Sequence, residues 1–314
     1  MTSSNTQGKP LSQATATTKL AINALEWYMT VDGYRPDLAP ALPEIYRQIR
    51  ASGFQAVPID PPDSMTLAAY RTLLSDAGLA PAPGYFSAPF SVASERQAIV
   101  EGARQAAGQH AELGLDRLFI ADHFADAARL AAPGQGAGHD PARLAVLIDN
   151  LRFAAEAMVE QGVRPCLHQH VGTLIETPGE VESVLAEIGP ELLLFGPDTG
   201  HLAWAGADVA AIIRRHAGRI GAVHLKDLHM AVAAAGRSAG EDYWQICGHH
   251  LWTEPGRGDL RFDEVLEAFA GFEGWFVVEV DVADQPTPLE SAQVSWQWCE
   301  RHLRGRSPGG VGHP

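Results

Sequence analysis

Short runs of apolar residues recur along the chain, with helix-like segments between them. Eight of these runs are too short to form helices, and several are rich in Val, Ile and Leu, as strands buried on both faces are. We therefore predict eight strands, in chain order at residues 20–25, 54–59, 79–85, 115–121, 163–168, 192–195, 220–225 and 275–280.

The segments between the predicted strands carry helix signals. Asp140 stands directly before Pro141, which places a capping side chain ahead of a proline at the first helical position. The stretch TPGE at 177–180 has the spacing of a capping box. Glycines lie near the predicted helix ends, where a left-handed cap is favoured, at Gly53, Gly162, Gly189 and Gly218. Strand followed by helix, eight times, predicts an α/β fold of the (β/α)₈ TIM barrel type in preference to an open doubly wound sheet, which seldom reaches eight units.

The ends of the chain differ in composition from the segment between them. Residues 1–18 are Ser/Thr-rich and nearly uncharged, and residues 307–314 are rich in Gly and Pro, so we expect a disordered N-terminal tail and a flexible C-terminal tail. Residues 19–306 form the predicted barrel domain. Its connections 123–139 and 229–260 are long and follow the fourth and seventh predicted strands. In a barrel both lie at the catalytic face, where they could act as lids.

Composition narrows the class of protein further. The chain has 314 residues, of which 46% are hydrophobic and 19% charged, and a formal net charge of −15, so we expect a globular protein that does not bind nucleic acid. The three cysteines, Cys166, Cys247 and Cys299, lack a CxxC spacing, which argues against a disulfide framework or a structural zinc site. No apolar stretch is long enough for a signal peptide or a membrane span. We therefore expect a cytoplasmic protein without a membrane partner.

Residue types that bind metals follow four consecutive predicted strands. The segments are CLHQH at 166–170, GPDTGH at 196–201, VHLKD at 223–227 and VVEVD at 277–281, and Asp122-His123 follows the strand before them. A single His at a strand end is usually a hydrogen-bonded core residue, but side chains at the C-terminal ends of barrel strands converge on one site. Imidazoles mixed with carboxylates suit Mn²⁺, Co²⁺, Fe²⁺ or Zn²⁺ better than Mg²⁺ or Ca²⁺.

These segments resemble a known family. DTGH at 198–201, VHLKD at 223–227 and VVE at 277–279 are similar to the metal-site motifs of the xylose-isomerase-like sugar isomerase and epimerase superfamily. The myo-inosose dehydratase branch of that superfamily is closer still, because it shares a His-rich segment before Gly-Thr, here HQHVGT at 168–173, and an Ala-Gly-x-Asp stretch, here at 205–208. The resemblance covers nearly the whole chain and is strongest over 166–290, where Pro-Leu-Glu at 288–290 also matches that branch.

The resemblance implies a single divalent ion, with Mn²⁺ or Co²⁺ favoured and Zn²⁺ or Fe²⁺ as alternatives. Asp198, His224 and Glu279 match three protein ligands of the superfamily, and His168 stands where the isomerases have a fourth ligand, a glutamate. In the isomerases that glutamate is half of the acid–base pair that moves a proton between adjacent carbons. Its replacement by His favours a dehydratase, a carbon–oxygen lyase that acts on a keto-cyclitol or keto-sugar.

The same resemblance suggests roles for other residues. His170 or His201 would exchange the proton alpha to the ketone, and Lys226 would orient a hydroxyl or stabilise negative charge. Four residues at the rim are expected to contact substrate hydroxyls, namely Glu26, His123, Glu176 and Arg257. The alternative for each of them is a solvated charge on a loop. The expected partner is a small polyhydroxylated keto substrate, and the family implies a homo-oligomer.

Alternative functions share parts of this pattern. The same metal site could serve a sugar isomerase or epimerase, or an eliminase that acts on a 3-keto glycoside. A DNA-repair endonuclease of the same superfamily needs a basic groove, which a net charge of −15 makes unfavourable. A sugar-binding barrel without catalytic activity has little need of four metal ligands.

Overall fold

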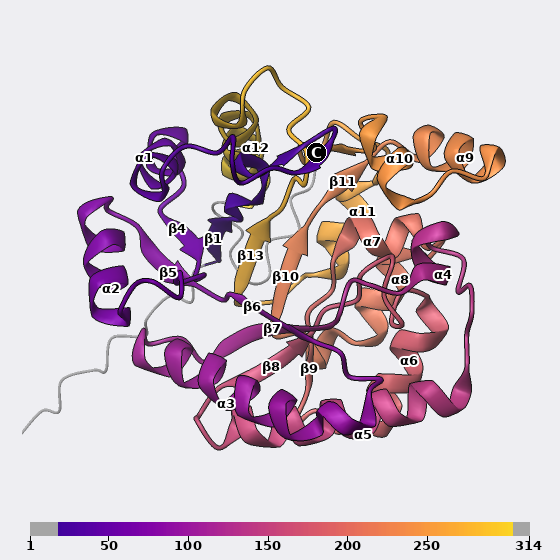
Figure 1. Cartoon of the computed structure of the whole chain (residues 1–314). Coiled ribbons are helices and arrows are strands. Elements are labelled where there is room, and N and C mark those ends of the chain that lie inside the picture. Colours follow the sequence, from indigo (N-terminus) through magenta and orange to yellow (C-terminus); the bar gives the residue numbers. More distant parts are fainter. Residues whose placement is uncertain (1–17, 304–314) are drawn as a thin grey trace, which may run out of the picture.

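Parallel strands form a ring that helices surround (Figure 1) in the computed structural model of the protein, which describes residues 18–303. The tails predicted at 1–18 and 307–314 lie outside the described residues, except for residue 18. Residues 19–303 thus belong to the segment predicted as the barrel domain, and this segment positions the candidate site.

Within residues 18–303 the ring has eight strand positions, and each overlaps one predicted apolar run. They are β1 (Lys19–Ile22), β4 (Ala56–Pro58), β5 (Ala80–Ala82) with β6 (Tyr85–Ala88), β7 (Arg117–Asp122), β8 (Arg164–Leu167), β9 (Leu194–Phe195), β10 (Ala222–Leu225) and β13 (Trp275–Val278). The first strand, β1, pairs in parallel with the last, β13, which in turn pairs with β10. Parallel pairs also join β4 to β5 and link β6 through β9, and a bridge between Phe195 and Ile220 continues toward β10. The predicted (β/α)₈ TIM barrel is confirmed.

Helices follow the strands of the ring along the chain. They are α1 (Leu42–Ser52), α2 (Leu67–Asp76), α3 (Arg96–Glu112), α4 (Ala127–Ala131), α5 (Pro141–Val159), α6 (Pro178–Glu187), α7 (Thr199–Trp204), α8 (Val209–Arg215), α9 (Met230–Ala239), α10 (Tyr243–Gly248), α11 (Phe262–Ala268) and α12 (Pro288–His302). Short 3₁₀ turns are η1 (Ala24–Trp27), η2 (Ala93–Glu95) and η3 (Ala217–Arg219). Over the described part of the chain, no helix combines the length and the apolar character that crossing a membrane requires.

The helix signals in the sequence have clear structural counterparts. The Asp140 side chain accepts hydrogen bonds from the first turn of α5, and Thr177 forms the predicted capping box with Glu180 at the start of α6. Gly53 and Gly162 adopt the left-handed conformation, with φ of 117° and 78°. The left-handed caps expected at two other glycines, Gly189 and Gly218, are wrong, since neither has a positive φ.

The two long connections after the fourth and seventh strands carry secondary structure of their own. The first, 123–139, contains α4, and the second, 229–260, contains α9, α10 and β12 (Trp252–Thr253), which pairs with β11 (Asp227–Leu228). A further hairpin, β2 (Met29–Thr30) with β3 (Gly33–Tyr34), follows the first strand. In Figure 1, α9 and α10 lie at the end of the barrel toward which β10 points, where a barrel places its active site.

Apolar side chains, four of them alanine, fill the interior of the ring. Each strand position contributes one buried residue to a compact inner cluster that is made of Ala21, Ala56, Ala82, Phe119, Cys166, Leu194, Ala222 and Val277. Burial raises the pKa of the Cys166 thiol to about 12, so at pH 7 it is a protonated, apolar part of this cluster. None of the three cysteines forms a disulfide. Because side chains alternate along an unbroken strand, residues two positions beyond this cluster on such strands point into the mouth of the barrel.

The third strand of the ring is interrupted at Pro83-Gly84, between β5 and β6. A Cβ on Gly84 would clash with the carbonyl oxygen of Ile59, so only glycine fits there. The Gly84 N–H donates to His110 Nε2 at 3.0 Å, and His110 Nδ1 donates to the carbonyl of Ala106 at 2.7 Å. His110 is therefore a buried neutral imidazole that stabilises the interruption.

This arrangement predicts a pH dependence of stability. Burial lowers the pKa of His110 to about 4, whereas an unfolded His titrates near its ordinary pKa of about 6.5. The unfolded state therefore binds the proton first, so the stability that the neutral imidazole contributes is present above pH ~6.5 and is lost as the pH falls toward 4. We expect this loss, about 3 kcal/mol at most, to be absent from His110→Gln when the free energy of unfolding is measured against pH.

A surface histidine supplies the control for this measurement. The His249 side chain, at the C-terminal end of α10, is 59% exposed and lies 3.2 Å from Glu241, so His249→Gln should keep the pH dependence of the wild type. If the free energy of unfolding changes equally with pH in the wild type and in His110→Gln between pH 4 and 6.5, His110 is not the source of the pH dependence.

Candidate metal centre

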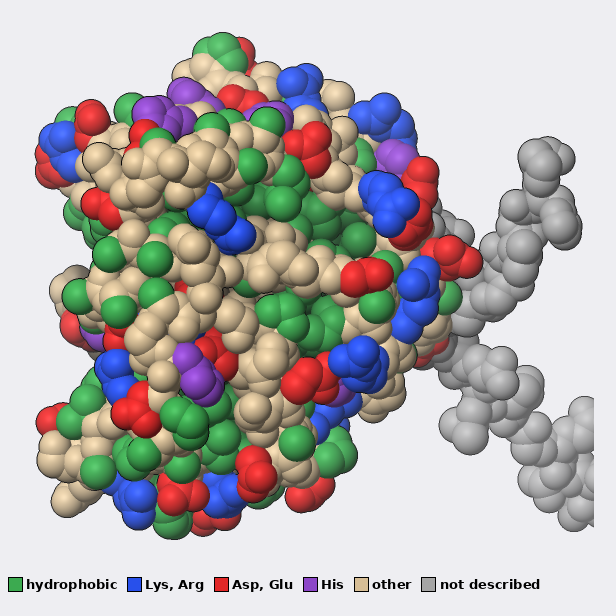
Figure 2. Space-filling model, turned by 90° about the vertical axis from the view of Figure 1, so that its right-hand side faces the viewer, with side chains coloured by type: hydrophobic (Ala, Val, Ile, Leu, Met, Phe, Trp, Pro, Cys, Tyr) green, Lys and Arg blue, Asp and Glu red, His purple; other side chains and the backbone are tan. Residues whose placement is uncertain are grey.

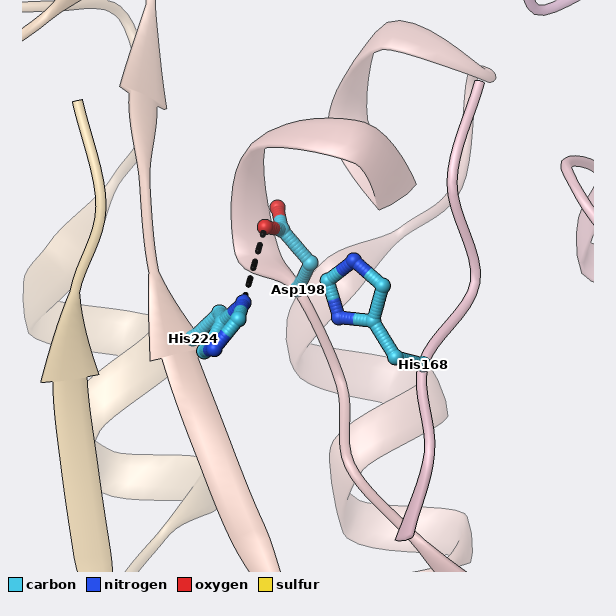
Figure 3. A group of neighbouring side chains, drawn as sticks. All are labelled: His168, Asp198 and His224. Carbon is cyan, nitrogen blue, oxygen red and sulfur yellow. Dashed lines mark ion pairs between the residues drawn. The ribbon is translucent and has the colours of Figure 1, made fainter. Parts of the chain in front are cut away.

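Three of the predicted metal ligands meet at the mouth of the barrel. Their ligand atoms all lie within 4.8 Å of one another, and the residues are His168, Asp198 and His224. They come from three neighbouring strand ends and point toward a common space (Figure 3). All three are buried, with exposed fractions of 2% or less. Residues that are up to 56 positions apart in the chain (168 to 224) thus form one group, which we call the metal-ligand group.

Local structure fixes each side chain in this group. Asp198 is the N-cap of α7, and its side chain accepts a hydrogen bond from the backbone N–H of His201 at 2.8 Å. A parallel bridge holds Asp198 beside His224, and the backbone N–H of His224 donates to the carbonyl of Pro197 at 3.0 Å. His168 directly follows β8, and its backbone N–H donates to the carbonyl of Ile120 at 2.8 Å. The capping bond uses only one Asp198 oxygen, which leaves Oδ2 for a ligand.

The metal-ligand group fits a divalent cation. Each member offers a buried atom that has no hydrogen-bond partner among residues 18–303, namely His168 Nδ1, Asp198 Oδ2 and His224 Nδ1. Such atoms are costly unless something binds them. Burial lowers the pKa of His168 and lowers that of His224 to about 4, so both imidazoles stay in the neutral form that binds a metal. Two imidazoles and one carboxylate suit Mn²⁺, Co²⁺, Fe²⁺ or Zn²⁺.

The fourth predicted ligand, Glu279, lies beside this group but is not part of it. Its Oε2 is 3.5 Å from His224 Nδ1 and accepts a hydrogen bond from Asn23 Nδ2 at 2.5 Å. Its Oε1 accepts from Lys226 Nζ at 2.9 Å. Burial opposes the charge, but the nearby Lys226 ammonium and His224 lower the pKa of Glu279 below its usual range. Glu279 is thus an ionised carboxylate that two donors hold next to the metal-ligand group.

Lys226 connects the residues around the metal-ligand group. Its ammonium donates to Asp281 Oδ1 at 2.7 Å, to Glu279 Oε1 at 2.9 Å and to His201 Nε2 at 3.2 Å. These bonds use all three donors of a lysine, and the residue has no exposed surface. Burial works against the charge, but Asp281, Glu279 and Asp198 raise the pKa of Lys226 above its ordinary value.

The rings of His170 and His201 contact each other next to this lysine, with centroids 3.8 Å apart and planes tilted by 41°. His170 Nδ1 donates to the carbonyl of Val171 at 2.7 Å, so its Nε2 carries the free lone pair. Burial and the charge of Lys226 lower the pKa of His170 to about 3, and burial also lowers that of His201, so both rings are neutral at pH 7. His201 is completely buried, whereas His170 is partly exposed. Of these two rings, His170 is therefore the one that offers a free ring nitrogen toward solvent.

The residues predicted to contact substrate hydroxyls separate into two kinds. His123 and Arg257 are exposed. Glu26 is buried, and burial raises the pKa of its carboxyl well above the ordinary value. Glu176 is also buried, which gives these two carboxyls surroundings unlike those of a solvated rim.

Glu176 fastens the connection 123–139 to the barrel. Its carboxylate accepts hydrogen bonds from Arg129 Nη1 at 2.9 Å and from the backbone N–H groups of Gly134, Gly136 and Gly172 at 3.0, 2.8 and 2.9 Å. Arg129 is itself buried and also pairs with Glu180. These contacts occupy both oxygens of Glu176 and assign it to the support of a loop.

Sequence reasoning missed several residues of the site. Asn23 contacts Glu279, and Asp281 contacts Lys226. The ring of Tyr85 contacts that of His168, with centroids 5.3 Å apart. Alternation gives a signal for two of them. Asn23 is two positions beyond Ala21, and Asp281 is two positions beyond Glu279, so each continues a barrel-facing row.

Known proteins share this fold and part of this sequence. A sequence model of the family described as Xylose isomerase-like TIM barrel matches residues 46–302. An inosose dehydratase of Geobacillus thermodenitrificans (strain NG80-2) is 37% identical over 138 residues, which cover 43% of this chain and 46% of that relative. The chain spans about half the length of the curated relatives that it matches.

Solved structures match over a larger share of the chain. The structure of an L-ribulose 3-epimerase has a TM-score of 0.67 and 16% identity, and the match covers 95% of this chain and 100% of that chain. A xylose isomerase-like TIM barrel protein from Mycobacterium smegmatis, in complex with magnesium, has a TM-score of 0.64 and 18% identity, covering 91% of this chain and 96% of that chain. At these identities the likeness shows the fold alone.

Proposed function

The chain belongs to the xylose isomerase-like TIM barrel family, and from this we propose that it is a metal-dependent carbon–oxygen lyase that dehydrates a keto-cyclitol or keto-sugar. The observation that carries the proposal is the metal-ligand group, in which His168 stands at the end of the fifth strand beside Asp198 and His224. Relatives named inosose dehydratase support the same reaction class. The family supports a small carbohydrate as the substrate.

A divalent ion bound by His168, Asp198 and His224 would supply a Lewis acid that polarises a ketone and stabilises an enolate. We favour Mn²⁺ or Co²⁺, with Fe²⁺ and Zn²⁺ as alternatives, because the group mixes imidazoles with a carboxylate. Glu279 would support the ion from beside the group, since its Oε2 lies 3.5 Å from His224 Nδ1.

His170 is the residue best placed to move the proton. Its Nδ1–H is engaged by the Val171 carbonyl, which leaves Nε2 free to accept a proton from the carbon alpha to the ketone. The electron pair of that C–H bond forms the new C=C bond as the neighbouring C–O bond breaks. The hydroxide that leaves needs one proton to become water, and protonated His170 can return it. His201 is unsuited to this step, because it is buried and accepts from Lys226.

Lys226 positions other groups and does not touch the substrate. Its three N–H donors are already used by Asp281, Glu279 and His201. By holding Glu279 ionised and fixing the orientation of His201 behind His170, it keeps the polar side of the site in one arrangement.

The competing functions find less support in the site. An isomerase or epimerase of this superfamily uses a glutamate where this chain has His168. For an endonuclease the surface is unfavourable, and Figure 2 shows one face on which Lys and Arg side chains are scattered among Asp and Glu. The net charge of −15 points the same way.

A substrate screen tests the proposal. The protein is stripped with a chelator, loaded separately with Mn²⁺, Co²⁺, Fe²⁺ or Zn²⁺, and given keto-inositols, ketoses and 3-keto glycosides. We expect ultraviolet absorbance from an enone or dione, together with loss of one water from the product mass, and no reaction without metal. An epimer or isomer of unchanged mass as the product would contradict the dehydratase, and a released aglycone would identify a keto-glycoside eliminase instead.

A further inference from the structure

Barrel-facing side chains are exposed on one side of the barrel mouth and buried on the other. On the side of the metal-ligand group, the residues His168, Asp198, His224, Lys226 and Glu279 are all 5% exposed or less. On the third strand, β6 carries Tyr85, which is 44% exposed, and Ser87, which is also exposed. A side chain that faces the inside of a closed barrel is exposed only where open space adjoins it, so the space for a substrate lies against β6.

Pairing and packing establish that Tyr85 and Ser87 face inward. Tyr85 pairs in register with Phe119, a member of the inner cluster, and its ring meets the edge of His168 with centroids 5.3 Å apart. Phe86, between them, packs outward against Phe90 and toward α3, next to Gly102. Tyr85 therefore faces the inside of the barrel and contacts the metal-ligand group through the ring of His168.

The interruption at Pro83-Gly84 is what gives Tyr85 this position. Ala82 faces inward, as part of the inner cluster. In an unbroken strand the next inward residues would be Gly84 and Phe86. Because the strand breaks, the alternation shifts by one residue and Tyr85 and Ser87 face inward instead. The shift replaces a glycine and an apolar ring with two hydroxyl groups.

We propose that Tyr85 and Ser87 bind hydroxyl groups of the substrate and determine which keto substrate the enzyme accepts, an inference that rests on the proposed function. Within residues 18–303 the Tyr85 hydroxyl forms no hydrogen bond to another side chain or backbone group, so it is free to bond a ligand. A phenol and a serine hydroxyl each donate and accept, which matches a ring that carries several hydroxyls. The aromatic face of Tyr85 can also pack against the C–H face of such a ring.

The test compares Tyr85→Phe and Ser87→Ala with the wild type in the Mn²⁺-loaded protein. Calorimetry measures binding of myo-inositol, a polyhydroxylated ring that has no ketone to react, and kinetics measure KM and kcat for every substrate that turns over. Tyr85→Phe keeps the ring that packs on His168. We expect each variant to weaken myo-inositol binding and to raise KM about fivefold to tenfold with kcat nearly unchanged, as the loss of one hydrogen bond predicts. Metal content should match the wild type.

Tyr34→Phe is the matched control, since Tyr34 is 58% exposed on β3 and its ring contacts that of Tyr28, with centroids 6.1 Å apart, and it should change neither binding nor KM. Unchanged binding and KM in both site variants, or wild-type protein that neither binds myo-inositol nor turns over a hydroxylated substrate, would overturn the inference. If myo-inositol binding depends on Tyr85 but no substrate is dehydrated, the proposed function is refuted and the binding role of Tyr85 stands. If a substrate is dehydrated and neither Tyr85→Phe nor Ser87→Ala changes binding or KM, the proposed function stands and the binding role of both residues is refuted.

Discussion

Asp198→Ala is expected to lose the bound divalent ion and, with it, about 10³-fold or more of kcat/KM. A Lewis acid contributes several kcal/mol to stabilising an enolate, and each 1.36 kcal/mol changes a rate about tenfold. Asp198 supplies the only carboxylate of the three-residue group, and its Oδ2 has no hydrogen-bond partner among the described residues. Metal content measured by mass spectrometry, alongside steady-state kinetics, checks this expectation.

Asp198 also caps α7, so the alanine variant alone does not separate metal loss from a damaged fold. Asp198→Asn keeps a side-chain oxygen that can accept the His201 N–H, which the native carboxylate does at 2.8 Å. It removes the charge that a cation requires. We expect Asp198→Asn to unfold at nearly the wild-type temperature and yet to bind metal at least about 10-fold more weakly. Metal affinity and activity like those of the wild type in both variants would contradict the metal centre.

Lys226→Met is expected to lower the free energy of unfolding by about 3–5 kcal/mol. The substitution keeps an unbranched side chain of similar length but leaves the buried carboxylates of Glu279 and Asp281 without the ammonium that they contact at 2.9 and 2.7 Å. An uncompensated buried charge is far more costly than a missing surface ion pair. Denaturant unfolding in the presence of a chelator measures the effect without a contribution from bound metal.

A second substitution identifies the cause of that loss. In Lys226→Met/Asp281→Asn one of the two uncompensated charges is gone, so we expect the double variant to be more stable than Lys226→Met alone. If Lys226→Met has the same free energy of unfolding as the wild type, or if the double variant is no more stable than Lys226→Met, the lysine does not hold these carboxylates in the folded protein.

The parts of the fold that depend on local sequence were predictable. Strands of a barrel are covered by helices outside and by the inner cluster inside, so their apolar runs are continuous, and all eight were visible. The cap at Asp140 and the capping box at Thr177 use residues within one helical turn. The split of the third strand was not predictable, because the clash that requires Gly84 comes from the Ile59 carbonyl of the preceding strand region.

The candidate site was predictable to the extent that barrel topology alone determines it. Strand ends converge, so His168, Asp198 and His224 meet as the motif positions imply. The detailed partners are non-local: Glu279 is held by Asn23, 256 positions away, and Glu176 is buried because Arg129 and the backbone of 134–136 fold over it. Sequence shows that such a residue carries a charge, but not which donors surround it.

The central claim is that three strand ends hold one ion in common. A crystal structure of the protein loaded with Mn²⁺, with anomalous scattering recorded at the manganese edge, tests this most directly. We predict a single strong peak within about 2.3 Å of one ligand atom each from His168, Asp198 and His224. A manganese peak bound by other residues, or no peak in this space at saturating Mn²⁺, would contradict the account.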